Sequence, residues 1–138
     1  MKNSIRVYSP ASVSNVTCGF DILGFALEKP GDIILAEQST RPGVRIKEII
    51  GGSTLPLDPK ENVASVAAQA LVNHINPGFG IDLTVHKGIK PGSGIGSSAS
   101  SAAAAAFAAN QLAGAPIKDT LGLIPFAMQG ELLASGAF

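Results

Sequence analysis

Residues 91–101 read Pro91-Gly92-Ser93-Gly94-Ile95-Gly96-Ser97-Ser98-Ala99-Ser100-Ser101, and five alanines follow at once. Glycine at three alternate positions lets the backbone approach a ligand closely, because no Cβ stands in the way. Alanine is the strongest helix former and serine is a favoured N-cap residue, so we expect a helix that begins at Ser97. A glycine loop that leads into a helix N-terminus suits anions, since bare N–H groups and the positive end of the helix dipole face the ligand. The stretch therefore predicts a loop that binds a phosphate chain.

Other glycine-rich segments fit this stretch less well. A P-loop requires a lysine directly after its last glycine, and none follows here. The dinucleotide fingerprint matches through Gly94, Gly96 and Ala99, but its acidic partner would be Asp119, which opens a helical stretch instead of ending a strand. A flexible linker is not followed by a long helix-forming run. The segment from Pro91 to Ser100, with its Gly-x-Gly-Ser-Ser-Ala core, resembles the phosphate loop of the GHMP kinases.

Composition sets the class of protein. The 138 residues are 46% hydrophobic and 14% charged, which is enough for one domain with a packed core. Ten basic and ten acidic residues give a formal net charge of +0, so nothing favours a nucleic-acid or membrane partner. Cys18 is the single cysteine, no signal peptide is visible, and no apolar run reaches the roughly 18–20 residues of a membrane span. We therefore expect a cytoplasmic protein without disulfides.

Hydrophobic periodicity indicates an α+β fold. Strands are expected at residues 5–8 (ended by Ser9-Pro10), 22–27, 33–36, 44–49 and 81–85, the second and third forming a hairpin around the turn 29–32. Helices are expected from Val63 with Asn62 as N-cap, from Ser97 to Leu112, and from about Lys118 with a kink or restart at Pro125. This order lacks a regular βαβ alternation, so helices on one face of a mostly antiparallel sheet are expected.

A second motif lies near the N-terminus. Residues 10–24 read Pro-Ala-Ser-Val-Ser-Asn-Val-Thr-Cys-Gly-Phe-Asp-Ile-Leu-Gly, which resembles the first motif of homoserine kinases within the GHMP kinase superfamily. The two motifs stand in the family's order. The resemblance implies the N-terminal GHMP kinase domain, a ribosomal-protein-like α+β sandwich, over residues 1–138. Because the sequence stops at Ala137-Phe138, we expect the family's C-terminal domain to be absent and this fragment alone to be inactive.

The reaction implied by the resemblance is transfer of the γ-phosphoryl group of ATP to the side-chain hydroxyl of L-homoserine, in threonine biosynthesis. Two other interpretations remain open. The chain could belong to a GHMP kinase that acts on another small alcohol, which the first motif disfavours. It could also be a non-catalytic domain of the same fold, which magnesium-dependent ATP binding would exclude.

The resemblance also implies roles for individual residues at the nucleotide. The ATP phosphates are expected on the loop 91–101, where backbone N–H groups replace water without a lysine. Ser98 matches the family's magnesium-binding serine and Glu131 its magnesium carboxylate, and such hard oxygen donors suit Mg²⁺. Asn62 matches the residue at the adenine end of the nucleotide, and it is also the expected N-cap of its helix.

At the substrate, the resemblance places Asn15 on the homoserine hydroxyl and Asp21 near its ammonium group. Asn15, Ser98 and Glu131 are thus the expected catalytic residues, with no residue identified as a general base. Phosphoryl transfer depends mainly on positioning and charge neutralisation, so this is chemically reasonable. Apolar residues near Leu132, Leu133 and Phe138 favour self-association, and a homodimer is expected.

Overall fold

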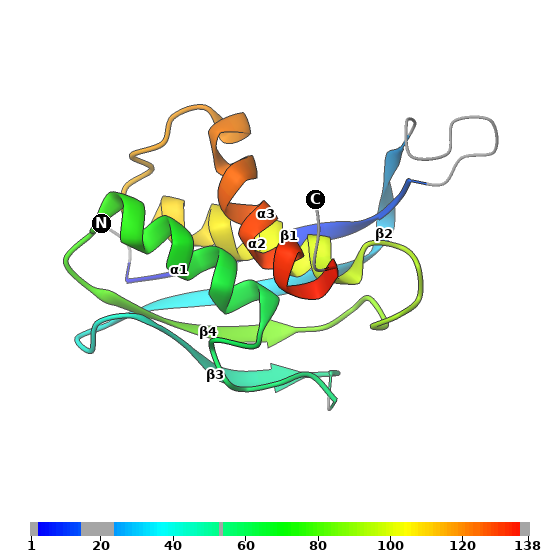
Figure 1. Ribbon diagram of the computed structural model, residues 1–138, viewed down its shortest axis with the longest axis horizontal. Coiled ribbons are helices and arrows are strands. Elements are labelled where there is room, and N and C mark those ends of the chain that lie inside the picture. Colours follow the sequence, from blue (N-terminus) through cyan, green and yellow to red (C-terminus); the bar gives the residue numbers. More distant parts are fainter. Residues whose placement is uncertain (1–2, 15–23, 53, 136–138) are drawn as a thin grey trace.

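The computed structural model describes residues 3–14, 24–52 and 54–135. Their elements follow one another as β1 (Ser4–Val13), β2 (Phe25–Ser39), β3 (Val44–Ile50), α1 (Val63–Ile75), β4 (Gly80–His86), α2 (Ser97–Leu112), the short 3-10 helix η2 (Thr120–Leu123) and α3 (Ile124–Ser135) (Figure 1). Among these described residues, no helix is long and apolar enough to cross a bilayer.

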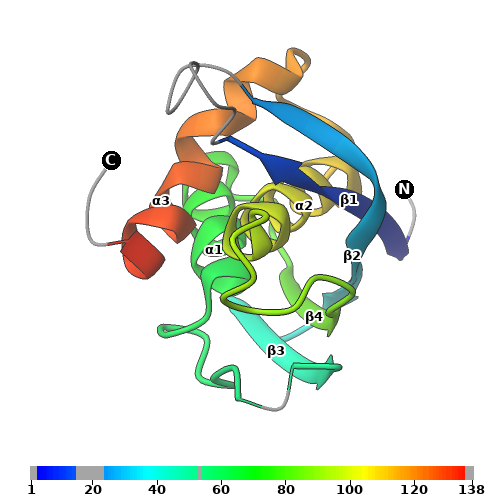
Figure 2. The same ribbon diagram turned by 90° about the vertical axis from the view of Figure 1, so that its right-hand side faces the viewer.

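The four strands form one sheet in the order β1-β2-β4-β3. Strand β2 is antiparallel to both of its neighbours, whereas β3 and β4 are parallel and α1 connects them. All three helices lie on one side of this sheet, which curves around them (Figure 2). Helix α2 packs on β1 and β2, and α3 packs on α1 and α2. The expected α+β fold with helices on one face of a mostly antiparallel sheet is confirmed.

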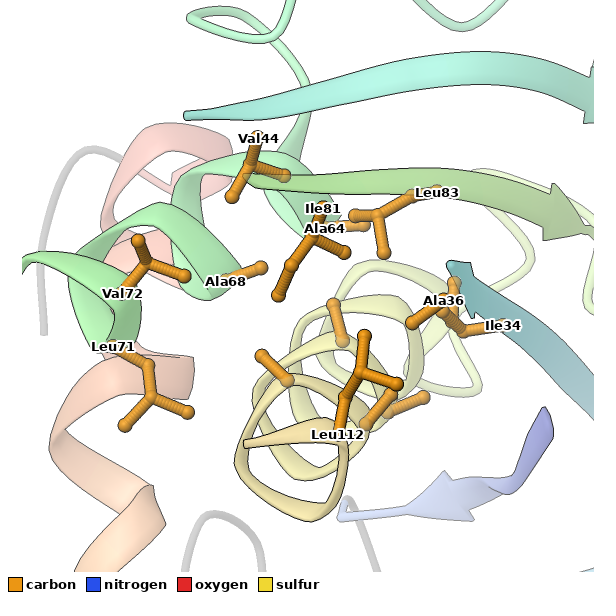
Figure 3. Packing of buried hydrophobic residues seen from close by; sticks show 14 of the residues in the cluster. Ile34, Ala36, Val44, Ala64, Ala68, Leu71, Val72, Ile81, Leu83 and Leu112 are labelled. Atoms are coloured by element: carbon orange, nitrogen blue, oxygen red, sulfur yellow. The ribbon is translucent and has the colours of Figure 1, made fainter. Parts of the chain in front are cut away.

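The core lies between the sheet and its helices. Ile34 of β2 and Leu83 of β4 point toward α2, and Leu71 of α1 and Leu112 of α2 close the space from the other side (Figure 3). All four side chains are at most 1% exposed. Alternation along the strands explains this inward face, because successive side chains point to opposite sides of a sheet.

Helix α2 is buried on almost every side. Its alanines at 102, 104–106, 108 and 109 are at most 2% exposed, since the sheet, α1 and α3 all contact this helix. A helix that is apolar all round belongs in the interior, and methyl side chains allow its neighbours to approach closely. Gly130 of α3 serves the same close packing, because a Cβ there would lie 2.5 Å from the Val63 carbonyl oxygen and 3.1 Å from the Ala102 Cβ.

Two strand predictions were wrong. Strand β1 does not end at Ser9-Pro10 but continues to Val13. Proline is tolerated because β1 is an edge strand, and the register shifts between Pro10 and Ser12. The expected hairpin at residues 22–36 is also absent over its described part, because β2 runs from Phe25 to Ser39 through the turn-like residues 29–32.

The contacts of Tyr8 show how the long strand accommodates those residues. The Tyr8 hydroxyl donates to the Glu28 carbonyl at 2.7 Å. Its ring lies against Gly31, where a Cβ would come within 2.3 Å of the ring. A side chain at this position would displace the exposed Tyr8 ring, so glycine lets the ring lie against the paired strand. The signature that predicted a turn marks an irregular strand instead.

The other elements agree with the sequence. Helix α1 begins after the N-cap Asn62 and ends at Ile75, and its C-cap Asn76 has a left-handed conformation (φ 47°). Helix α2 spans Ser97–Leu112 as expected. Pro125 stands in the first turn of α3, directly after η2, so it restarts the helix and does not kink it.

Candidate functional site

A cavity of about 350 Å³ opens where the glycine loop meets the first turns of α1 and α2. Its walls come from parts of the chain that are distant in sequence. The lining residues are Leu55 and Pro56 before α1, Glu61–Val63 at its start, Val85 and Lys87 at the end of β4, Pro91, Gly92, Gly94 and Gly96 of the loop, Ser97, Ser98 and Ser101 of α2, and Ala134 of α3.

The glycine loop owes its shape to three left-handed residues. Gly92, Gly94 and Gly96 have φ angles of 78°, 80° and 75°, which side chains disfavour. A Cβ at Gly92 or Gly94 would meet no protein atom within 4 Å. These two glycines thus leave the backbone bare at the cavity, which agrees with a loop that a ligand approaches closely.

The N-terminus of α2 opens onto the same cavity. Ser97 was expected to be the N-cap, but Gly96 holds that position in a left-handed conformation. No side chain therefore caps the helix through a hydrogen bond from the N-cap position. The helical ladder starts with the Ser100 N–H, which donates to the Gly96 carbonyl at 2.9 Å. The N–H groups of Ser97, Ser98 and Ala99 therefore have no acceptor within the helix. Such groups bind anions, and an N-cap side chain that would compete for them is missing.

The N-terminal motif and the glycine loop come together at the end of β1. The Ser12 N–H donates to the Ile95 carbonyl at 3.0 Å, and the Ser100 hydroxyl donates to the Ser9 carbonyl at 2.8 Å. Gly96 lies so close to β1 that a Cβ there would stand 2.6 Å from the Ser12 Oγ. A side chain at the third glycine would thus force the Ser12 hydroxyl to move, in addition to the strain of the left-handed backbone.

Part of the cavity lining is apolar and includes Leu55, Pro56, Val63 and Val85. Asn62 lines the same cavity. The Asn62 side chain is committed to the fold, since its Oδ1 accepts from the Ala64 N–H at 3.0 Å and its Nδ2 donates to the Pro56 carbonyl at 2.9 Å. Its expected role as N-cap is confirmed, and a contact with the nucleotide stays a prediction.

Sequence reasoning missed the charged pair beneath the loop. Lys87 and Asp32 form an ion pair whose side chains are only 2% and 0% exposed, and Ser101 hydrogen-bonds to both. Asp32 was assigned to a turn, and Lys87 was assigned no role. A lysine directly after a buried strand and before a glycine, at the start of a glycine loop, is a signal that could have singled out Lys87, but nothing in the sequence points to Asp32 as its partner.

Of the remaining residues considered in the sequence, the structure describes Ser98 and Glu131. Ser98 lines the cavity, as expected for a residue at the phosphates. Glu131 lies on α3, half-buried with its Oε1 shielded from solvent, and the cavity wall takes Ala134 from this helix instead. Asn15, Asp21 and Cys18 lie outside the described residues. Within the described ranges, no group of three or more His, Cys, Asp or Glu side chains could hold a metal ion.

Known proteins are similar to this chain in sequence. Residues 62–137 match the family model described as the GHMP kinases N terminal domain. A homoserine kinase of Chloroherpeton thalassium is 43% identical over 141 residues, which cover 94% of this chain and 44% of that protein. A homoserine kinase of Xanthomonas campestris pv. campestris is 41% identical, with 96% of this chain and 41% of that protein covered. The chain thus spans less than half the length of these relatives.

Solved structures give the same picture. The crystal structure of homoserine kinase from Cytophaga hutchinsonii matches with a TM-score of 0.94 and 44% identity, covering 99% of this chain and 44% of that one. A mevalonate kinase from methicillin-resistant Staphylococcus aureus matches with a TM-score of 0.68 at 20% identity over 99% of this chain and 47% of its own, a likeness of fold alone.

Proposed function

Because this chain belongs to the GHMP kinase family, we propose that it carries the ATP-binding half of a homoserine kinase, which phosphorylates L-homoserine to O-phospho-L-homoserine in threonine biosynthesis. The observation that carries the proposal is the cavity that a bare glycine backbone and an uncapped helix N-terminus both line. Identities of 41–43% to proteins named homoserine kinase support the choice of acceptor.

The cavity suits a nucleoside triphosphate along its whole length. The apolar wall formed by Leu55, Pro56, Val63 and Val85 offers a place for the adenine ring, with Asn62 beside it. The N–H groups at the start of α2 and the bare backbone at Gly92 and Gly94 offer donors for the phosphates. Backbone donors on a rigid helix need no reorganisation when charge develops on the transferred phosphoryl group, which is how such sites accelerate phosphoryl transfer.

The two residues that we assign to the metal have the chemistry that Mg²⁺ prefers. The Ser98 hydroxyl and the Glu131 carboxylate are hard oxygen ligands of the kind that this ion prefers, and we assign them to it. When bound, Mg²⁺ would neutralise charge on the phosphate oxygens. Ser98 lies at the first turn of α2, so the same turn provides both N–H donors and a hydroxyl.

The acceptor is assigned to the first motif. Asn15 would align the homoserine hydroxyl and Asp21 would pair with its ammonium group. Support comes from the hydrogen bond between Ser12 and Ile95, which joins the end of β1 to the glycine loop. This contact brings the start of the first motif against the glycine loop, which supports an acceptor site near the proposed phosphate site. A homodimeric state and a cytoplasmic location stay predictions.

The test uses the full-length gene product. It is incubated with MgATP and L-homoserine, mevalonate or galactose in turn, and ADP release is followed together with the ³¹P NMR signal of the product. We expect turnover in the range of about 1–100 per second with L-homoserine, as is typical of kinases, and far slower reaction with the other two alcohols. A higher kcat/KM for mevalonate or galactose would exclude the proposed acceptor, and absence of MgATP binding would exclude a kinase.

A further inference from the structure

The two ends of the glycine loop are tied to a single carboxylate, that of Asp32 on β2. At the leading end of the loop, the Asp32 Oδ1 accepts from the Gly88 N–H at 2.9 Å and from the Ile89 N–H at 3.0 Å. Both N–H groups belong to the segment that leaves β4 for the loop. One oxygen of this carboxylate therefore fixes where the loop begins.

The other oxygen of Asp32 fixes where the loop ends. Its Oδ2 accepts from the Lys87 Nζ and from the Ser101 hydroxyl, the latter at 3.0 Å. The Lys87 Nζ also donates to the Ser97 carbonyl at 3.0 Å and to the Ser101 Oγ at 2.9 Å. Ser97 and Ser101 lie in the first turns of α2. Lys87 thus connects the carboxylate to the helix whose N-terminus faces the cavity.

Lys87 lines the cavity but does not have the free donors of a phosphate ligand. Its ammonium group carries three N–H donors, and the three acceptors Asp32, Ser97 and Ser101 use all of them. The charge is neutralised by Asp32, and both side chains are almost completely buried. Burying an ion pair contributes little net stability, because desolvation offsets the attraction. A positional role explains this arrangement better than a role in stability.

We propose that Asp32, Lys87 and Ser101 are positioning residues that hold both ends of the glycine loop in the geometry that binds the phosphates of ATP. The inference rests on the proposed function and deepens it. Without these hydrogen bonds, the loop would adopt the phosphate-binding conformation only part of the time. The apparent dissociation constant for ATP equals the intrinsic one divided by the fraction of molecules in that conformation, so it would rise. The adenine end of the cavity, formed largely by residues outside this network, would keep its shape.

The test compares two ligands that share the adenine end. MgATP and adenosine are titrated by isothermal calorimetry into the full-length wild-type protein and the double variant Asp32→Asn/Lys87→Met. This variant removes both charges at nearly constant volume, so no buried charge is left unpaired. Its asparagine can still accept from Gly88 and Ile89, whereas the tie to Ser97 is lost. We expect the Kd for MgATP to rise about tenfold or more and the Kd for adenosine to stay within about twofold.

Asp82→Asn is the matched control, because it breaks an ion pair with Arg45 (2.8 Å) in the same sheet but away from the cavity. It should leave both dissociation constants unchanged. Equal losses for MgATP and adenosine in the double variant, or an unchanged Kd for MgATP, would overturn the inference.

Should the double variant fail to fold, Ser101→Ala decides, since it removes one hydroxyl and leaves the ion pair intact. We expect the Kd for MgATP to rise about threefold or more while the Kd for adenosine stays the same. If the ratio of the Kd for MgATP to the Kd for adenosine did not change, the positioning role would be overturned. A wild-type protein that binds no MgATP would instead refute the proposed function, and the inference with it.

Discussion

Replacing Gly94 by alanine tests whether the bare backbone of the loop receives the phosphates. Gly94 has a φ angle of 80°, and a Cβ built there meets no protein atom within 4 Å. The substitution therefore causes no steric clash within the protein, and the cost to stability is the left-handed strain of an L-residue, about 1–2 kcal/mol. The new methyl group would, however, stand at the wall of the cavity.

The expected effect on ligand binding is larger than the strain. If the methyl group prevents one backbone N–H from reaching a phosphate oxygen, the loss is that of a hydrogen bond to a charged group, roughly 1.5–3 kcal/mol. This corresponds to about a 10- to 150-fold rise in the Kd for MgATP. Isothermal calorimetry measures the Kd, and thermal unfolding measures the strain as a fall in the melting temperature.

Gly78→Ala provides a matched control. Gly78 has nearly the same φ angle (84°) and equally open surroundings, but it lies in the loop between α1 and β4, at the far end of both elements from the cavity. Both variants should lose similar stability, and only Gly94→Ala should lose affinity for MgATP. If both variants bound MgATP as the wild type does, the reasoning that places phosphates at this loop would be refuted.

Three further changes address separate parts of the protein. Ser98→Ala should lower kcat by more than tenfold and raise the Kd for MgATP far less, because it removes one proposed Mg²⁺ ligand. Steady-state kinetics measures kcat, and a value within about twofold of the wild type would exclude that role. Gly130→Leu should lower the free energy of unfolding by about 3 kcal/mol, since the Cβ of the new leucine would lie 2.5 Å from the Val63 carbonyl oxygen. A urea titration measures this loss of stability. Asp21→Asn should raise KM for L-homoserine about 10- to 150-fold and leave KM for ATP unchanged; equal effects on both constants would assign Asp21 a structural role.

The elements that local sequence signals specify could be predicted well. The bounds of α2 follow from a run of strong helix formers between Gly96 and Gly114, and the N-cap at Asn62 follows from its amide side chain. The left-handed backbone of the loop follows from Gly92, Gly94 and Gly96, whereas its role as a phosphate site stays a prediction. These signals lie within a few residues of one another, so no knowledge of the tertiary structure is needed.

The features that depend on distant partners could not be predicted. Residues 29–32 have the composition of a turn, but pairing with β1, in which Gly31 lies opposite Pro10, keeps β2 continuous there, and pairing with β4 begins at Ile33. The ion pair of Asp32 and Lys87 joins residues 55 positions apart, and neither residue carries a local sign of its partner. Register and buried charge pairing are properties of the assembled sheet.

The alanines of α2 also have a thermodynamic consequence for ligand binding. An alanine side chain has no rotamers, so burying it costs no side-chain conformational entropy. Ala102, Ala105 and Ala106 lie in the turns that directly follow the proposed phosphate site, and each is completely buried. Folding therefore fixes these side chains without side-chain entropy loss, and a ligand at the N-terminus of the helix finds no alanine rotamers to order. Substitution of these alanines by longer residues would disturb the heat and entropy of binding even where the contacts with the ligand stayed the same.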